Sequence, residues 1–190
     1  MLRGVTLDVH GGQVLQLSGA NGAGKTTLLR ALCGLMHLEE GRVLWGERDV
    51  RDDLPAYHGR LAYLGHEPPL KADLTARENL RYWVGVRRPV PADRLHGALE
   101  VVGVPHVGER LVRTLSAGQR RRVALAGLML LGAPLWLLDE PTTNLDADGQ
   151  QLVARLIERH IAAGGLVVAA VHQELAVTTP GLTRLELVGA

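Results

Sequence analysis

With 190 residues and a formal net charge of +1, the chain has the length of one domain and lacks the general basic surface that nucleic-acid binding requires. Its single cysteine, Cys33, excludes an internal disulfide framework and predicts a reducing compartment. No signal peptide is evident, and the longest apolar stretch, 123–138, is short for a membrane span and contains glycine and proline, which predicts a chain that is soluble by itself.

Short strands and one helix are predicted in the first part of the chain. The strands cover 5–9, 14–17, 42–45 and 61–64, where apolar residues alternate or run together. The helix covers 27–32, directly after a glycine-rich loop, and Gly34 ends it. Cys33 lies at the end of this helix and is interpreted as a small buried hydrophobe. Pro68 and Pro69 predict a rigid loop after the fourth strand.

The second part begins with helices and returns to alternating strands and helices. Thr75 and Glu78 form a capping-box pattern, which predicts that a helix begins there. Further helices are predicted over 91–102, 123–131 and 146–162, and strands over 135–138, 166–171 and 183–188, the last as an antiparallel edge strand. This order predicts one α/β domain over residues 1–190, built around a largely parallel sheet, with a helical insert at about 68–126.

The loop between the second strand and the first helix matches the phosphate-binding pattern G-x-x-x-x-G-K-[ST] at every fixed position. Glycines let the backbone wrap around a polyphosphate, and the helix N-terminus adds partial positive charge. Lys25 is predicted to reach the β- and γ-phosphates, and the Thr26 hydroxyl to ligate Mg²⁺. A glycine-rich turn that binds nothing is disfavoured, because the match lies between a strand and a helix. The predicted nucleotide-binding residues of this segment are Gly19, Ala20, Asn21, Gly22, Ala23, Gly24, Lys25, Thr26 and Thr27.

Two later strands end in side chains that suit nucleotide chemistry. Asp139 and Glu140 follow a buried strand, at the sheet edge where ligands bind in open α/β folds. Asp139 is predicted to hold Mg²⁺ through water, and Glu140 to polarise the attacking water as the general base. His172 ends the next apolar strand and is predicted to hydrogen-bond the γ-phosphate. The alternatives are a solvated acidic turn for the carboxylates and an ordinary strand-end histidine.

The segment Leu115–Gln119, with the sequence Leu-Ser-Ala-Gly-Gln, is a second anion-binding device. A serine, a glycine and a following helix N-terminus offer hydrogen-bond donors to a phosphate. One chain has little use for two such devices on one γ-phosphate, whereas two chains placed head to tail would complete each other's sites. Ser116, Gly118 and Gln119 are therefore predicted to bind nucleotide.

In this order, the phosphate loop, the Leu-Ser-Ala-Gly-Gln segment, the Asp139–Glu140 pair, the run 144–146 and His172 resemble the nucleotide-binding domain of an ABC transporter ATPase. The resemblance covers nearly the whole chain. It implies a P-loop fold with a central, mainly parallel sheet, an antiparallel β part and a helical insert. It also implies a homodimer with ATP at the interface, in which Ser116 and Gly118 act in trans and His172 is the switch histidine.

Within this superfamily, the segments 63–68, 74–80, 115–126 and 171–173 are similar to the ATP-binding subunits of the haem exporters of cytochrome c maturation. This resemblance implies two integral membrane partners, of the haem-exporter B and C types, and a peripheral position on the cytoplasmic face of the inner membrane. The cargo stays open between haem itself and a haem–protein complex that is released from a membrane partner.

Two departures from the family pattern affect these expectations. Glu67 stands where the family has a glutamine that contacts both Mg²⁺ and the membrane partner. Its carboxylate is expected to ligate Mg²⁺ while adding negative charge beside the γ-phosphate. Family members also carry an earlier strand, with an aromatic residue that stacks on adenine. We expect either that the true start lies upstream or that other contacts hold the adenine.

Other function classes share part of this pattern. A different ABC transporter, or a soluble ABC ATPase of the iron–sulfur-cluster assembly type, would carry the same catalytic residues with other partners. A nucleic-acid ATPase of this superfamily would need a long coiled coil or two such domains, and the arginines 120–122 form the only basic run. A simple kinase or GTPase has no need of the segment Leu115–Gln119.

Overall fold

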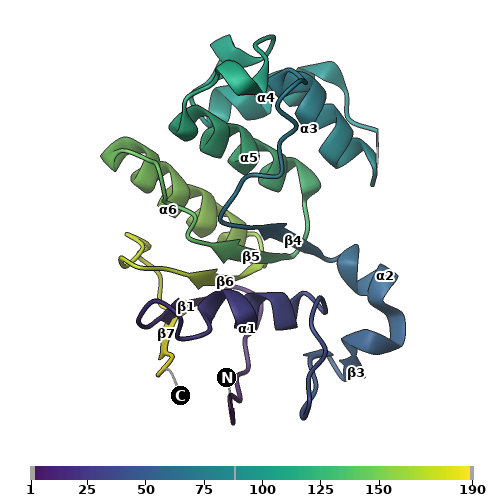
Figure 1. Cartoon of the computed structure of the whole chain (residues 1–190), viewed down its shortest axis with the longest axis vertical. Coiled ribbons are helices and arrows are strands. Elements are labelled where there is room, and N and C mark those ends of the chain that lie inside the picture. Colours follow the sequence, from purple (N-terminus) through teal and green to yellow (C-terminus); the bar gives the residue numbers. More distant parts are fainter. Residues whose placement is uncertain (1–2, 88, 189–190) are drawn as a thin grey trace.

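A five-stranded sheet forms the centre of the structure (Figure 1). The computed structural model describes residues 3–87 and 89–188. Along the sheet the strands lie in the order β4 (Leu61–Leu64), β5 (Leu135–Asp139), β6 (Leu166–Ala170), β1 (Val14–Ser18) and β7 (Leu182–Glu186). All four neighbouring pairs run parallel, and a separate antiparallel pair joins β2 (Leu44–Trp45) to β3 (Arg48–Asp49). The predicted central parallel sheet with an antiparallel part is confirmed.

Both faces of the sheet are covered by helices, as strands that are apolar on both sides require. In β1, Leu15 and Leu17 pack with α1 (Lys25–Leu32) and α2 (Leu54–His58), whereas Val14 points to the opposite face. That face is covered by α5 (Ala117–Leu131) and α6 (Ala147–Ala162). Cys33 caps α1 and is 2% exposed, and burial raises the pKa of its thiol to about 12, so it is the small buried hydrophobe that was predicted.

Three helices form a layer above the β4 end of the sheet in Figure 1: α3 (Ala76–Gly85), α4 (Ala92–Val101) and α5. The predicted capping box begins α3, because the Glu78 backbone N–H donates to Thr75 Oγ1 and the Thr75 N–H donates to the Glu78 carboxylate. Helix α5 packs against α3, α4 and β4. Its Gly127 leaves room for the Trp83 ring of α3, which a Cβ would overlap. The predicted insert boundary at about 126 falls inside α5.

The connections between these elements include short helical turns. Single 3₁₀ turns cover Val50–Asp53, Pro105–Val107 and Val112–Thr114. Within the two described ranges, no helix has the length and apolar character that crossing a membrane demands.

Two strand predictions were wrong in part. The segment 5–9 pairs with no described strand, and its alternation reflects instead the packing of Leu7 and Val9 against the α1 side of the core. The last strand, β7, lies at the sheet edge as predicted, but it runs parallel to β1. After β6 the chain returns over 171–181 to the starting edge, where the Val14 N–H donates to the Gly181 carbonyl at 2.9 Å. Because it re-enters from that edge, the strand must run in the direction of β1.

Candidate active site

The phosphate loop joins β1 to the N-terminus of α1 and has a backbone that suits only glycine at key positions. Gly19 has φ 137°, and a Cβ there would overlap the carbonyl oxygen of Leu187, which follows β7. Gly24 has φ 100° and precedes the first residue of the helix. Both conformations lie in the left-handed region that favours glycine. The predicted strand–loop–helix arrangement is therefore present.

Lys25 lies inside this loop. It is 7% exposed, and its ammonium donates to the carbonyls of Gly19 at 2.7 Å and Ala20 at 3.1 Å. Thr26 is half-buried in the first turn of α1, and Thr27 beside it is exposed. A buried ammonium at the N-terminus of a helix, within a glycine-rich loop, is a site for a polyphosphate anion.

The register of the sheet brings the carboxylates to the same edge. Asp139 pairs with Ala170 of β6, and Ala170 pairs with Leu17 of β1, two residues before Gly19. Asp139 is separated from β1 by two strand spacings, a distance of about 10 Å. Asp139 is 3% exposed and forms the end of β5. The structure therefore places this carboxylate across β6 from the start of the phosphate loop.

Glu140 is held by side chains from the loops after β4, β5 and β6. Its Oε1 lies 2.6 Å from His172 Nε2, the Thr143 hydroxyl donates to its Oε2 at 3.1 Å, and His66 Nδ1 lies 3.4 Å from Oε2. The side chain keeps 20% exposure, so water reaches it. Its φ of 50° is uncommon for a residue with a Cβ and is of the kind that clusters at functional sites.

The structure gives His172 a partner within the chain and adds one residue to the candidate site. The structure pairs the His172 imidazole with the Glu140 carboxylate, and the contact of His172 with the γ-phosphate stays a prediction. His66 was not predicted at all. It follows β4, the neighbour of β5, so its position at the end of an adjacent strand was the available signal.

The candidate Mg²⁺ ligands are all oxygen donors: the Thr26 hydroxyl and the carboxylates of Asp139 and Glu67. Glu67 lies in the loop after β4 and is exposed. In the described part of the chain, no three His, Cys, Asp or Glu side chains gather as a protein-only metal centre would need. Mg²⁺ in nucleotide sites takes one or two protein ligands, with waters and phosphate oxygens completing the shell. The residues present fit such a shared site.

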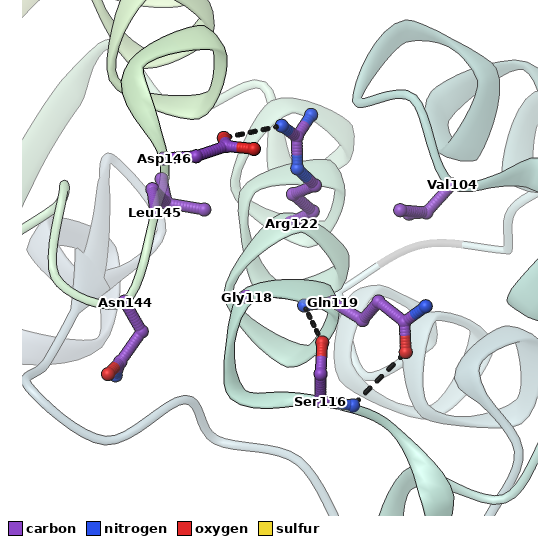
Figure 2. A pocket seen from close by; sticks show the side chains of 8 residues that line it. All are labelled: Val104, Ser116, Gly118, Gln119, Arg122, Asn144, Leu145 and Asp146. Atoms are coloured by element: carbon purple, nitrogen blue, oxygen red, sulfur yellow. Dashed lines mark hydrogen bonds and ion pairs between the residues drawn. The ribbon is translucent and has the colours of Figure 1, made fainter.

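The second anion-binding device begins α5. Ser116 is its N-cap, and Gln119 completes a capping box, with the Gln119 N–H donating to Ser116 Oγ and the Ser116 N–H donating to Gln119 Oε1, each at 3.1 Å (Figure 2). A Cβ on Gly118 would lie 3.0 Å from the carbonyl oxygen of Asn144, so this glycine permits a close approach of two loops.

A cavity of about 330 Å³ opens beside this helix start. Figure 2 shows its lining side chains, among which Arg122 and Asp146 point toward one another, with 3.3 Å between Nη2 and Oδ1. The lining residues are Val104, Ser116, Gly118, Gln119, Arg122, Asn144, Leu145 and Asp146. None of them belongs to the phosphate loop, so this cavity contains only one of the two anion-binding devices.

Comparison with known proteins identifies the family. A model of the ABC transporter family matches residues 2–143. Three similar relatives carry the description "Cytochrome c biogenesis ATP-binding export protein CcmA". The Xanthomonas oryzae relative is 47% identical, covering 94% of this chain and 83% of its own length. The Yersinia pestis relative is 42% identical, covering 92% of this chain and 80% of its own length. The Vibrio cholerae relative is 39% identical, covering 98% of this chain and 91% of its own length.

Solved structures agree on the fold. An ABC transporter ATP-binding protein from Pyrococcus furiosus superposes with a TM-score of 0.84 at 24% identity, covering 96% of this chain and 88% of that one. A dimeric ATP-binding cassette in a post-hydrolysis state with ADP and Pi superposes with a TM-score of 0.79 at 25% identity, covering 90% of this chain and 80% of that one. The resemblance inferred from the motifs is confirmed: the chain belongs to the ABC transporter family and, within it, to the group of CcmA proteins.

Proposed function

We propose that this chain is the ATP-binding and ATP-hydrolysing subunit of an ABC transporter complex that drives haem export or delivery in cytochrome c maturation. The observation that carries the hydrolytic part is the position of Glu140, which lies at the strand-end edge that also carries the phosphate loop and is held by His172 and His66. The names of the CcmA relatives carry the assignment to cytochrome c biogenesis.

The residues divide the reaction among them. Lys25 and the loop amides bind the β- and γ-phosphates. Glu140 takes a proton from water as the water oxygen attacks the γ-phosphorus and the bond to the β–γ bridging oxygen breaks. His172, 2.6 Å from Glu140 Oε1, fixes the direction of that carboxylate. Thr26, Asp139 and Glu67 would hold Mg²⁺, which neutralises phosphate charge when bound.

Two chains are proposed to complete each site. Ser116, Gly118 and Gln119 lie in a cavity that excludes the phosphate loop of their own chain, so they are available to the γ-phosphate on a second copy. The similarity to a cassette solved as a dimer with ADP and Pi supports a homodimer, and the two separate anion-binding devices of the chain support its head-to-tail arrangement. ATP at the interface closes the dimer, and hydrolysis opens it.

The proposed partners are integral membrane subunits of the haem-exporter B and C types, with this chain peripheral on the cytoplasmic face of the inner membrane. The motion of the dimer passes to them through the exposed loop around Glu67. Its product is either haem transfer or release of a haem–protein complex.

Glu67→Gln is expected to raise the Mg²⁺ concentration for half-maximal hydrolysis by about fivefold, the equivalent of about 1 kcal/mol between two charges in water. An amide oxygen keeps the shape of the ligand but loses its charge. The measurement is ATP turnover during a Mg²⁺ titration at fixed ATP. Glu47→Gln changes an exposed glutamate in the β2–β3 turn and serves as the control. An unchanged titration would count against a metal role for Glu67.

Affinity purification of the tagged chain from its own membranes tests the proposed complex. We expect haem-handling membrane subunits to be recovered, and their retention in the Glu140→Gln variant to depend on ATP. Recovery of an unrelated permease would keep the transport ATPase and remove the haem assignment. Recovery of soluble cluster-assembly proteins alone would replace the membrane complex with the alternative class.

A further inference from the structure

Arg121 is a fully buried arginine whose guanidinium is surrounded by backbone carbonyls. It is the fifth residue of α5, is 1% exposed, and is the largest of the fully buried side chains. Its Nε donates to Pro141 at 3.1 Å, its Nη1 to Gly65 at 2.8 Å and His66 at 3.3 Å, and its Nη2 to Asp139 at 2.9 Å and to Glu140. These five bonds match the five N–H donors of a guanidinium.

The acceptors belong to two loops that are far apart in the sequence. Gly65 and His66 follow β4 and lead directly to Glu67, whereas the other three carbonyls belong to residues 139–141, the last residue of β5 and the two that follow it. Strands β4 and β5 are neighbours, but their ladder ends at the pair Leu64–Leu138. Beyond that pair, the Arg121 guanidinium links the two chain segments by hydrogen bonds to their carbonyls, in place of strand pairing. It thereby fixes the loop after β4 against the end of β5.

Burial of this charge argues for a specific role. Desolvation of a guanidinium is unfavourable, and it lowers the pKa of Arg121 to about 10, with the carboxylates of Asp139 and Glu140 opposing the shift. The side chain therefore stays charged at neutral pH. Its charge adds positive potential behind the two acidic residues, and its planar fork sets the direction of their backbone.

Arg122, the next residue, makes a clear contrast. Its guanidinium donates to the Val102 carbonyl at 2.9 Å and pairs with Asp146, at the cavity beside Ser116. Two consecutive arginines of α5 therefore lie in different surroundings. Arg122 lies at the surface that would meet a second copy, whereas Arg121 binds the catalytic loops of its own chain.

We propose that Arg121 is a positioning residue that anchors the Glu67 loop and the Glu140 turn to α5, and so holds both acidic groups in place for hydrolysis. This inference rests on the proposed function. Arg121 does not touch the reacting atoms and acts through the position of the two acidic groups. Its replacement should therefore lower kcat, whereas ATP affinity is set by the phosphate loop before α1.

The first test compares Arg121→Lys and Arg121→Gln with the wild-type full chain. Lysine keeps the charge but has three donors and no fork, so at least two carbonyls lose their partner. We expect kcat for ATP to fall about tenfold or more with lysine and further with glutamine, while KM stays within about threefold. Arg155→Gln removes an exposed arginine from α6 and should leave both constants unchanged.

Thermal unfolding separates folding from positioning. If the glutamine variant fails to fold, the lysine variant carries the test. A folded Arg121→Lys protein with wild-type kcat would overturn the inference. A variant whose KM rises while its kcat stays at the wild-type value would overturn it as well. A wild-type chain that does not hydrolyse ATP would overturn the proposed function instead, so the two failures can be told apart.

Mixed dimers give a second, sharper test. Lys25→Ala in one chain leaves one working site, formed by the intact phosphate loop and Glu140 of one chain and by Ser116 of the other. We expect Arg121→Lys to lower turnover about tenfold when it lies in the chain that supplies Glu140, and less than about twofold in the chain that supplies Ser116. A loss that follows the Ser116 chain would overturn the inference, because all five carbonyl acceptors lie beside Glu140 of the same chain.

Discussion

Glu140→Gln lowers ATP turnover by roughly 10²–10⁴-fold, the range expected for loss of a general base, and leaves ATP binding intact. The amide keeps the size of the carboxylate and cannot take the proton of the attacking water. Because ATP is bound but not cleaved, the variant accumulates as an ATP-bound dimer. Steady-state turnover and size-exclusion chromatography with Mg²⁺-ATP measure the two effects.

The matched control for that variant is Glu100→Gln, which neutralises an exposed glutamate on α4. It should hydrolyse ATP like the wild type and should not accumulate as a dimer. A Glu140→Gln protein that stays monomeric and active would remove Glu140 from the catalytic role and shift attention to its neighbours.

Lys25→Ala weakens ATP binding by about 10²-fold or more, the equivalent of two charge-assisted hydrogen bonds. The buried ammonium donates to the carbonyls of Gly19 and Ala20 and is placed to transfer these bonds to phosphate oxygens. Alanine removes the charge and both donors. Isothermal titration of the folded variant with Mg²⁺-ATP measures the change in Kd.

Lys71→Ala is the natural control, because Lys71 is the only other lysine in the chain. Its ammonium lies over the Tyr82 ring, 4.0 Å from the centroid, in the helical layer. The variant should bind ATP with wild-type affinity. If the two lysine variants bind equally well, the phosphate loop does not hold the nucleotide in the way proposed.

The features that the sequence predicts well are chemically local. The phosphate loop, the capping box at Thr75, and the carboxylates at the end of β5 each depend on residues that are neighbours along the chain. Their geometry follows from backbone sterics and short-range hydrogen bonds. These segments therefore also carry most of the candidate site.

The features that were missed depend on distant pairings. The contact of His66 with Glu140 and the carbonyl cluster around Arg121 form only once β4 and β5 lie side by side. The direction of β7 could not be predicted, because apolar alternation has the same period in parallel and antiparallel strands. For Leu7 and Val9, the same alternation reflected burial without strand pairing.

Helix α5 connects the catalytic loops of the chain to helices α3 and α4. Its 15 residues span about 22 Å, and Arg121 fastens it near one end. Farther along, the Trp83 ring of α3 fills the space above Gly127. Helices α3 and α4 both pack against α5, and the Arg122 guanidinium also donates to the Val102 carbonyl at the end of α4. The helix that holds the backbone of both catalytic carboxylates therefore also supports the packing of α3 and α4.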